Sequence, residues 1–443
     1  MRGLRFIILL LIAIPVAWYA YHDSTKGPID DSPKRDKVFS VEADKIDELE
    51  VKSEAGERTT LRRKGTEWEI VQPVAAPSDQ ATVSGITSNL ASVEIQRVIE
   101  EKPSDLKEFG LAEPRVEVAF KTGGKERRLQ LGQKTPSGSD VYAKLADDPK
   151  VFLVSSFLDS TFNHSTLDLR DKSVLKLDRE KIDTMEVTAS GHTSRFEKKA
   201  GEWQIAEPPS GRADFGAIDG LVSRVSSVQM KSIVAAPRDL KTYGLDKPAA
   251  TVRLGSGSSQ ATLLVGAAAE GETGSVYAKD FSRPTIFTID STLVDDLKKD
   301  ASEYRQKDLF DARSFNTTRM EITRNGQTSV FEKTKVKDKD GKEEEKWRQT
   351  APSARDLDAA KVETLISAAT GARATGFVDS TAKTGLDKPE LSVMFKYDEG
   401  KEERVAFARA AGQAYASRTG SPGAARIDAS VIDAIVKAVE GLK

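Results

Sequence analysis

A tyrosine followed two residues later by a lysine occurs twice in the sequence, and this pattern is suited to acid–base chemistry. Tyr142 precedes Lys144, and Tyr277 precedes Lys279. Residues two apart point to the same face of a strand, so each pair could exchange protons with a bound substrate. A third copy of the pattern has serine in place of lysine. We therefore interpret each pair as a packed tyrosine beside a lysine whose apolar stem lies along the surface.

Three tryptophans form the second group with chemical potential, because an exposed indole can stack on a sugar. Trp68, Trp203 and Trp347 each follow a charged residue at the start of an expected strand. Recurrence at one position favours packing in a core or half-buried site over a ligand platform. We assign no catalytic residue, no cofactor-binding residue and no metal ligand from these patterns.

An acidic stretch around Gly341 resembles a calcium loop only superficially. If Gly341 held the sixth position of such a loop, Val336 and Trp347 would stand at ligand positions, which they cannot fill. Residues 333–346 instead predict a charged, protruding hairpin with an Asp-Gly turn.

Composition excludes several functional classes. The 443 residues contain no cysteine and three histidines, so disulfides, thiolate chemistry and a zinc centre are not expected. The 67 basic and 69 acidic residues give a formal charge of −2 and alternate finely along the sequence. A nucleic-acid groove needs excess positive charge on one face, so we predict no nucleic-acid partner.

The same landmarks recur three times in the same order and at nearly constant spacing. Each copy has a tryptophan, a helical stretch, a Gly-Leu-x-x-Pro element and a tyrosine in a later strand. We name these residues the repeat landmarks: Trp68, Gly110, Pro114 and Tyr142; Trp203, Gly244, Pro248 and Tyr277; Trp347, Gly385, Pro389 and Tyr415. The protein therefore consists mainly of three tandem copies of one module, and we expect the landmarks to be structural.

Each copy predicts an α+β module. Short strands separated by turn residues indicate an antiparallel sheet meander, followed by one packed helix and further hairpins. The first helical stretch is expected near 78–98, with its N-cap at Ser78 or Asp79. Apolar residues spaced three, four and three apart mark the helix face in two copies: Val83, Ile86, Leu90 and Val93, then Phe215, Ile218, Val222 and Val225.

The expected domains follow from these patterns. Residues 1–21 form an N-terminal membrane anchor or signal, 22–37 a tether, 38–172 module 1, 173–307 module 2 and 308–443 module 3. The third module is a variant, because it contains the charged hairpin insertion. It also ends in an amphipathic helix over 431–442, capped by Ser430, and lacks the closing run Leu169-Arg170-Asp171-Lys172 or Tyr304-Arg305-Gln306-Lys307 of the other copies.

The N-terminus predicts attachment to a membrane. Met1 to Arg5 is basic, and residues 6–21 are apolar with aromatic residues at the far end. About 16 apolar residues give roughly 24 Å of helix, which spans a slightly thinned bilayer. A cleaved signal peptide has a similar apolar length, but aromatic residues interrupt the expected cleavage site. An uncleaved anchor is favoured, with secretion after cleavage as the alternative.

With these features in place, the sequence resembles a bacterial family known as domain of unknown function 4340, over about 38–443. The resemblance rests on the N-terminal anchor, the strand-turn-Trp opening, the Tyr-Gly-Leu-x-x-Pro element, the Val-Tyr-Ala-Lys hairpin and the closing runs. It implies a single-pass protein of the bacterial inner membrane with most of its residues in the periplasm. It also implies an accessory role beside an ABC-type permease and ATPase or gliding-type envelope components. No catalytic residue is assigned in that family.

The sequence thus predicts a non-catalytic, membrane-anchored binding or scaffold protein without cofactors. Tandem modules offer an extended surface, and sheet edges can accept a partner strand. One alternative is an envelope-glycan binding protein or glycan hydrolase that uses Asp and Glu carboxylates, whose separation a sequence cannot give. A purely structural spacer is the third hypothesis.

Overall fold

The computed structural model describes residues 35–207, 210–234, 239–337 and 343–442. These residues form two compact units, one ending at Asp171 and one beginning at Lys172. The first unit holds one nine-stranded antiparallel sheet, and the second holds two. The expected anchor at 1–21, most of the tether and the Asp-Gly turn lie outside the described residues. No helix within the described ranges is long and apolar enough to cross a membrane.

The first unit contains module 1, whose sheet has the strand order β4-β3-β2-β1-β6-β7-β8-β9-β5. Its elements in sequence order are η1 (Ala43–Lys45), β1 (Glu48–Lys52), β2 (Arg58–Lys64), β3 (Glu67–Gln72), β4 (Ala76–Pro77), α2 (Gln80–Ser92), β5 (Arg97–Glu100), η2 (Lys107–Phe109), β6 (Val116–Thr122), β7 (Lys125–Lys134), β8 (Asp140–Leu145), β9 (Val151–Ser155) and α3 (Phe157–Phe162).

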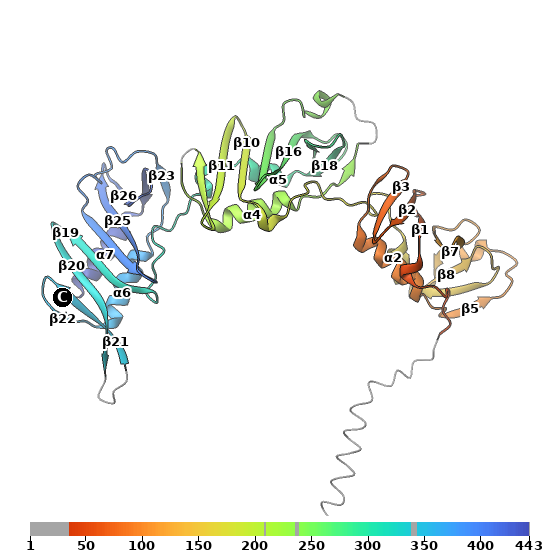
Figure 1. Cartoon of the computed structure of the whole chain (residues 1–443), viewed down its shortest axis with the longest axis horizontal. Coiled ribbons are helices and arrows are strands. Elements are labelled where there is room, and N and C mark those ends of the chain that lie inside the picture. Colours follow the sequence, from red (N-terminus) through yellow and green to blue (C-terminus); the bar gives the residue numbers. More distant parts are fainter. Residues whose placement is uncertain (1–34, 208–209, 235–238, 338–342, 443) are drawn as a thin grey trace, which may run out of the picture. The chain divides into compact units, whose positions relative to one another are not determined.

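This strand order consists of two meanders joined at the centre. Strand β1 pairs on one side with β2 and on the other with β6, both antiparallel. The backbone must therefore cross from the β4 edge to the β5 edge, and α2 makes that crossing on one face of the sheet (Figure 1). The helix begins at Gln80 and is capped by Asp79, whose carboxylate accepts a hydrogen bond from Thr82 N at 2.9 Å.

The second unit contains modules 2 and 3, each with a sheet of the same order. Module 2 comprises η3 (Arg179–Lys181), β10 (Thr184–Ala189), β11 (His192–Lys199), β12 (Glu202–Glu207), β13 (Gly211–Arg212), α4 (Phe215–Ser226), β14 (Ser232–Ile233), η4 (Leu240–Tyr243), β15 (Ala250–Ser256), β16 (Ser259–Ala268), β17 (Ser275–Asp280), β18 (Ile286–Asp290), α5 (Thr292–Leu297) and η5 (Ala301–Tyr304).

Module 3 repeats this plan with a helical end. Its elements are β19 (Thr317–Arg324), β20 (Gln327–Lys337), β21 (Glu343–Ala351), β22 (Arg355–Asp356), α6 (Ala359–Thr370), β23 (Gly376–Val378), β24 (Leu391–Tyr397), β25 (Lys401–Ala410), β26 (Gln413–Arg418), β27 (Ala424–Ile427) and α7 (Ala429–Glu440). The three sheets confirm the predicted α+β class with three tandem repeats.

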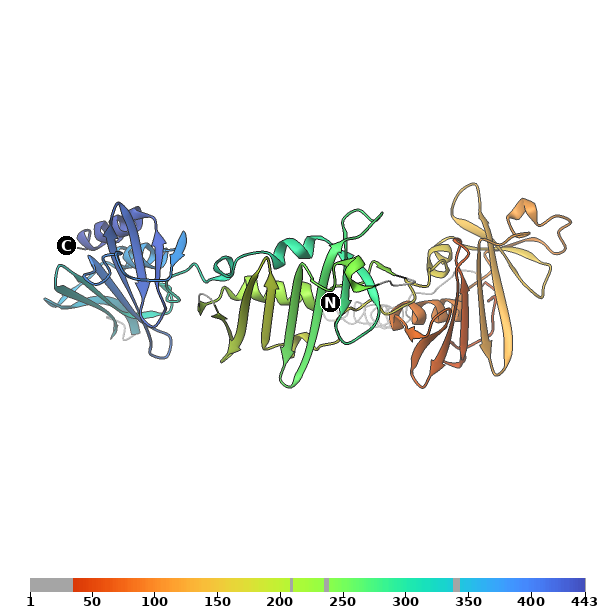
Figure 2. The same cartoon turned by 90° about the horizontal axis from the view of Figure 1, so that it is seen from above.

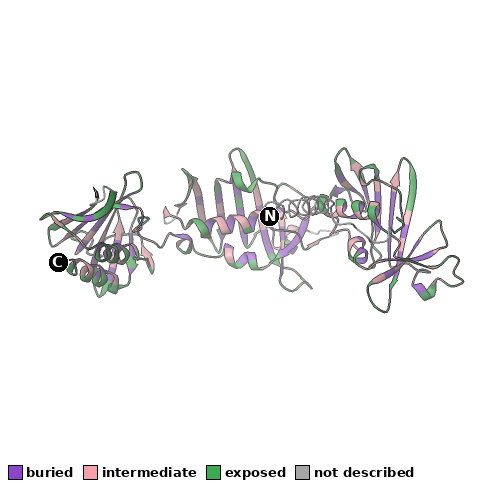
Figure 3. Ribbon diagram, turned by 90° about the horizontal axis from the view of Figure 1, so that it is seen from below, coloured by how far each residue is buried: buried purple, intermediate pink, exposed green. Residues whose placement is uncertain are grey.

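Each module has its own main core between the sheet and its helix. Leu49 and Val51 of β1 are fully buried, whereas the residues between and beside them are partly exposed. This alternation directs one sheet face to the helix and leaves the other open (Figures 2 and 3). The three main cores extend over Phe39 to Leu169, Val174 to Tyr304 and Leu309 to Leu442.

Several predicted helix details are wrong. The first helix ends at Ser92, and Val98 lies in edge strand β5. Phe215 is 51% exposed because it is the first residue of α4, and Leu221 takes its place on the buried face. The last helix is capped by Asp428 and not by Ser430; the Asp428 carboxylate accepts a hydrogen bond from Ser430 N at 2.8 Å.

The closing runs lie beside the start of the helix in modules 1 and 2. Arg170 forms an isolated bridge with Ser78, and Arg305 forms the equivalent bridge with Ala213. At the beginning of each module, a second bridge joins the incoming backbone to the residues after the helix, as between Asp308 and Arg373. The backbone thus enters and leaves along the two ends of the helix, which explains why the closing runs recur.

The charged insertion of module 3 forms the predicted hairpin in its described part. Strands β20 and β21 pair from Val330 to Lys337, whereas β19 pairs with β20 only as far as Glu332. Opposite charges face each other across the extension, with Lys333 and Glu345 at 3.5 Å. The extension therefore continues as a two-stranded ribbon of β20 and β21 beyond the point where β19 stops pairing with β20.

Tyr304 gives module 2 a defined response to alkaline pH. The side chain is 5% exposed, and its hydroxyl donates a hydrogen bond to Asp296 O at 2.8 Å. Burial raises the pKa of Tyr304 to about 12. The folded state holds this proton more tightly than the unfolded state. The resulting contribution of Tyr304 to the free energy of unfolding is therefore complete below the unfolded pKa near 10 and is lost as pH rises toward 12.

We expect Tyr304→Phe to remove that alkaline loss. Between about pH 10 and pH 12, the free energy of unfolding of the natural protein should fall by about 2–3 kcal/mol more than that of the variant. Urea unfolding across this range measures the difference, and the offset between the two proteins near neutral pH serves as the control. An identical pH dependence for both proteins would contradict the assignment.

Candidate functional site at the junction of modules 2 and 3

The three repeat tryptophans lie in the module cores. Trp68, Trp203 and Trp347 are 2%, 3% and 4% exposed. A cation from the neighbouring strand lies 4.9 to 5.9 Å from each indole centroid, contributed by Arg63, Lys198 and Lys333. The indoles therefore fill the cores and are covered from outside, which leaves no open platform for a sugar.

The repeat tyrosines of modules 1 and 2 belong to small apolar clusters on the open sheet face. Tyr142 lies between Val141 and Ala143, which both belong to the main core, so its ring points the opposite way. That ring packs on Phe109 at a centroid distance of 5.1 Å, and the rings of Tyr277 and Tyr243 are 4.9 Å apart. The Gly-Leu-x-x-Pro element is thereby held against the sheet.

The lysines beside these tyrosines have backbone partners. Lys144 is 8% exposed and donates a hydrogen bond to Leu145 O at 2.6 Å. Burial lowers the pKa of Lys144. Lys279 donates to the carbonyls of Asp280 and Arg283. Both lysine side chains are thus held by carbonyl oxygens at the end of their hairpin.

Close backbone contact explains the glycines of this element. Gly110 and Gly244 have φ of +66° and +65°, a conformation that favours glycine. Strands β7 and β16 contribute a further glycine each, and a Cβ on Gly132 or Gly266 would lie only 2.1 Å from the carbonyl oxygen of Phe109 or Tyr243. The element therefore needs glycine on both sides of the contact, a pairing that the landmarks alone did not identify.

Module 3 departs from this arrangement. Gly385 keeps its positive φ of +76°, but Thr384 stands where the other modules have an aromatic ring. Ala408 stands where they have Gly132 and Gly266, so its Cβ occupies the space of the close contact. Tyr415 consequently has no aromatic partner among the described residues of its module. The sequence difference at Thr384 thus removes the ring contact that modules 1 and 2 have.

We expect Gly266→Ala to destabilise module 2 by about 2–3 kcal/mol, because the added methyl group overlaps the Tyr243 carbonyl. Gly220→Ala in α4 is the matched control, since its Cβ meets only the Arg224 guanidinium at 3.7 Å. That control should leave stability unchanged or raise it by up to about 1 kcal/mol. Urea unfolding of both variants measures the difference; equal stabilities would rule out the tight contact.

The repeat prolines lie just before central strands. Pro114, Pro248 and Pro389 precede β6, β15 and β24, where no donor to the sheet is required. The Pro114 carbonyl accepts a hydrogen bond from Lys52 Nζ at 3.1 Å. Eleven of the twelve repeat landmarks thus lie in cores, in the small apolar clusters, in turns or next to the start of a strand; Tyr415, within β26, is half-buried and outside these clusters.

The open sheet faces carry paired charges. One carboxylate recurs on the central strand of each module, and each contacts two arginine side chains at 2.6 to 3.4 Å: Glu50 with Arg58 and Arg128, Glu186 with Arg195 and Arg253, and Glu321 with Arg319 and Arg404. These faces present positive and negative side chains that can donate and accept hydrogen bonds. In this respect they resemble polar protein-binding surfaces.

A series of ion pairs fixes the segment that joins modules 2 and 3. Arg212 pairs with Asp311, and Arg418 contacts Asp311 at 3.0 Å and Glu403 at 3.1 Å. The Glu403 side chain is fully buried and accepts hydrogen bonds from Asp311 N at 3.0 Å and Ala312 N at 2.7 Å. Burial opposes ionisation of Asp311, but the two arginines hold its pKa below the ordinary value.

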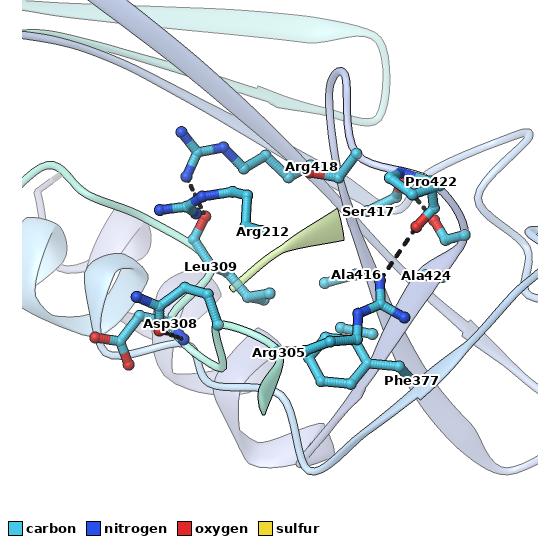
Figure 4. Close-up of a pocket in the computed structure, with 14 residues that line it drawn as sticks. Arg212, Arg305, Asp308, Leu309, Phe377, Ala416, Ser417, Arg418, Pro422 and Ala424 are labelled. Carbon is cyan, nitrogen blue, oxygen red and sulfur yellow. Dashed lines mark hydrogen bonds between the residues drawn. The ribbon is translucent and has the colours of Figure 1, made fainter. Parts of the chain in front are cut away.

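Arg305 of the closing run lies beside these ion pairs and lines a small cavity (Figure 4). Its guanidinium carbon lies 4.0 Å from the centroid of the Phe377 ring, and one of its nitrogens donates to Pro422 O at 3.4 Å. The residue is only 5% exposed. Arg212 and Arg418 line another side of the same cavity. Three arginine side chains, of which Arg305 is buried, thus line one cavity, and we take it as the candidate functional site.

This site is not among the features predicted from the sequence. Arg305 belongs to a predicted closing run, and Asp311, Glu403 and Arg418 are not among the repeat landmarks. One signal was present: Glu403, Val405 and Phe407 share one face of their strand, so a carboxylate stands at a core position. A buried carboxylate needs a cation and hydrogen-bond donors, which the distant Arg418 and the segment after Asp308 supply.

Comparison with known proteins identifies the family. The sequence profile described as Domain of unknown function (DUF4340) matches twice, over residues 68–204 and 203–389. The chain belongs to the DUF4340 family. Each DUF4340 match begins at a repeat tryptophan, so the family unit starts on the third strand of a sheet, whereas the structural module starts with its central strand.

Other comparisons add no functional information to the DUF4340 assignment. No curated protein sequence matches this one. The DNA polymerase sliding clamp of Pseudomonas aeruginosa aligns with 88% of this protein and 93% of its own length at 8% identity and a TM-score of 0.17. A DNA polymerase III beta subunit of the same organism, bound to griselimycin, covers 89% and 92% at 8% identity and a TM-score of 0.15. TM-scores of this size carry no structural inference.

Proposed function

We propose that this protein is a non-catalytic binding or scaffold protein, anchored in the bacterial inner membrane by residues 1–21 with its modules in the periplasm. In this proposal it serves an ABC-type permease and ATPase or a gliding-type envelope complex as an accessory component. The membrane setting rests on the basic and apolar N-terminal sequence, and the transport setting rests on the family resemblance.

One observation carries the binding function: the repeat landmarks serve mainly packing and turns. The tryptophans fill the cores, the tyrosines of modules 1 and 2 pack on a second ring, and Lys144 and Lys279 donate to carbonyl oxygens. Other parts of the surface differ between modules, including the charged hairpin of module 3. Repeated scaffolds with varied surfaces are typical of proteins that hold partners.

The paired charges on the open faces support contact with protein partners. Glu117, 8% exposed, accepts a hydrogen bond from Lys52 at 2.9 Å. Burial favours the neutral acid, but that hydrogen bond and the nearby cations hold the pKa of Glu117 below its ordinary value. Such ordered pairs define charge patterns that select partners by complementarity.

Chemical crosslinking in the source cell tests this proposal. The full-length protein is crosslinked, extracted from the membrane and subjected to mass spectrometry, with a version lacking residues 1–21 as the control. We expect a permease or its ATPase to be recovered with the full-length protein and lost with the control. Recovery of glycan fragments, or of no protein partner, would contradict the scaffold function and favour the glycan-binding or glycan-hydrolase alternative.

A further inference from the structure

Arg305 has spare hydrogen-bonding capacity beside a partly open cavity. A guanidinium carries five N–H donors, and the described structure gives this one a single long hydrogen bond, to Pro422 O at 3.4 Å. No carboxylate of the described residues lies within ion-pair distance of it, in contrast to Arg212 and Arg418. Asp379 lies outside ion-pair distance but favours the charged guanidinium, and burial outweighs this and lowers the pKa of Arg305. A buried arginine without a contacting anion is costly, so this arrangement calls for a further group.

The cavity beside Arg305 limits the size of that group. Its volume is about 40 Å³. A water-sized group needs roughly 10–15 Å³ by this measure, so the cavity admits about three such groups. A carboxylate has three heavy atoms, whereas a phosphate has five. The cavity therefore has room for a carboxylate, whereas a phosphate would extend into its open side.

The walls of the cavity suit a planar anion. The Phe377 ring holds the guanidinium from one side, which fixes its plane and leaves its edge for hydrogen bonding. Ser417 and Ser421 contribute hydroxyl groups, and Arg212 and Arg418 add positive potential although both pair with acids. Arginine and carboxylate form two parallel N–H···O bonds in this geometry.

We propose that the cavity at Arg305 binds a carboxylate group presented by a protein partner, either an Asp or Glu side chain or the C-terminal carboxylate of a polypeptide. This inference rests on the proposed binding function and assigns the chemistry of one contact. The junction is the site because Arg305, Phe377 and Arg212 come from three segments that meet there. The affinity for the partner would then depend on the geometry of the linker between modules 2 and 3.

Saturation-transfer NMR with the purified full-length protein in detergent tests this site. The probes are an acetylated and amidated peptide of sequence Ala-Glu-Ala, an acetylated trialanine with a free carboxylate, and the amidated Ala-Gln-Ala peptide as the neutral control. Arg305→Gln removes the guanidinium, and Ser421→Phe fills the cavity while keeping Arg305. Arg179→Gln removes the same charge from η3, where Arg179 contacts Asp219 of α4 at 2.8 Å, and is the matched control.

We expect saturation transfer to at least one carboxylate peptide and none to the neutral one. Because a charge-assisted bidentate contact contributes strongly to affinity, Arg305→Gln and Ser421→Phe should each weaken binding by about tenfold, and Arg179→Gln should not. The peptide that binds identifies the source of the carboxylate. Equal transfer from all three peptides, no transfer, or unchanged binding in both cavity variants would overturn the proposal. The crosslinking experiment would still report a partner in those cases, so the two proposals fail separately.

Discussion

Glu403→Leu should destabilise module 3 by about 3–5 kcal/mol, because it removes the acceptor for one buried and one half-buried N–H group and one partner of Arg418. The Glu403 side chain is fully buried on the helix-covered side of β25. Among the described residues, it alone accepts hydrogen bonds from both Asp311 N and Ala312 N, and so it holds the linker against this strand. Urea unfolding measures the loss, and hydrogen exchange should show faster exchange at residues 310–313.

Glu402→Leu is the matched control for this prediction. The neighbouring side chain is 58% exposed and contacts Lys396 at 3.4 Å. Exposed ion pairs contribute little, so this variant should change stability by less than about 1 kcal/mol. Similar losses for Glu402→Leu and Glu403→Leu would show that strand composition, and not the buried contact with the linker, sets the stability of this region.

Replacing any of the three repeat tryptophans by alanine should cost about 3–5 kcal/mol, because each substitution opens a cavity in its own core. Trp68→Ala should affect the first unit, and Trp203→Ala and Trp347→Ala the second. Hydrogen exchange followed by mass spectrometry locates each loss. The similarity of the three effects is the specific expectation of a shared structural role.

Trp203→Phe provides the internal comparison. The Trp203 Nε1 atom is buried without a hydrogen-bond partner in the described structure, so phenylalanine removes an unsatisfied donor while keeping most of the volume. Its cost should be below that of Trp203→Ala. If the alanine variants were as stable as the natural protein, the tryptophans would not be core residues, and a ligand-platform role would return.

The repetition of the module could be predicted from the sequence because equivalent core and turn positions carry the same residue types in different copies. Trp68 and Trp203 mark equivalent strands, and the positive φ of Gly110 and Gly244 requires glycine in both copies. The alternation around Leu49 and Val51 also predicts a half-buried strand. These features are local, so they can be recognised without a structure.

Tertiary features could not be predicted in the same way. Edge strands such as β14 (Ser232–Ile233) are short and have no pattern of their own; pairing with β18 defines them. The close contact between Gly266 and Tyr243 joins residues that only the sheet order brings together. The burial of Arg305 depends on Phe377 and Pro422, which lie far from it in the sequence; Pro422 follows it by 117 residues.

Photo-crosslinking at exposed phenylalanines in the source cell tests the scaffold function most directly. Phe157, Phe281 and Phe315 are 55%, 70% and 83% exposed, so a photoreactive phenylalanine analogue at each should leave the cores intact. Phe287, fully buried in module 2, is the matched negative position. A scaffold function predicts adducts with a membrane-transport or other envelope protein from at least one exposed position and none from Phe287. Adducts with glycan alone, or no adduct from any exposed position in the membrane-associated protein, would contradict it.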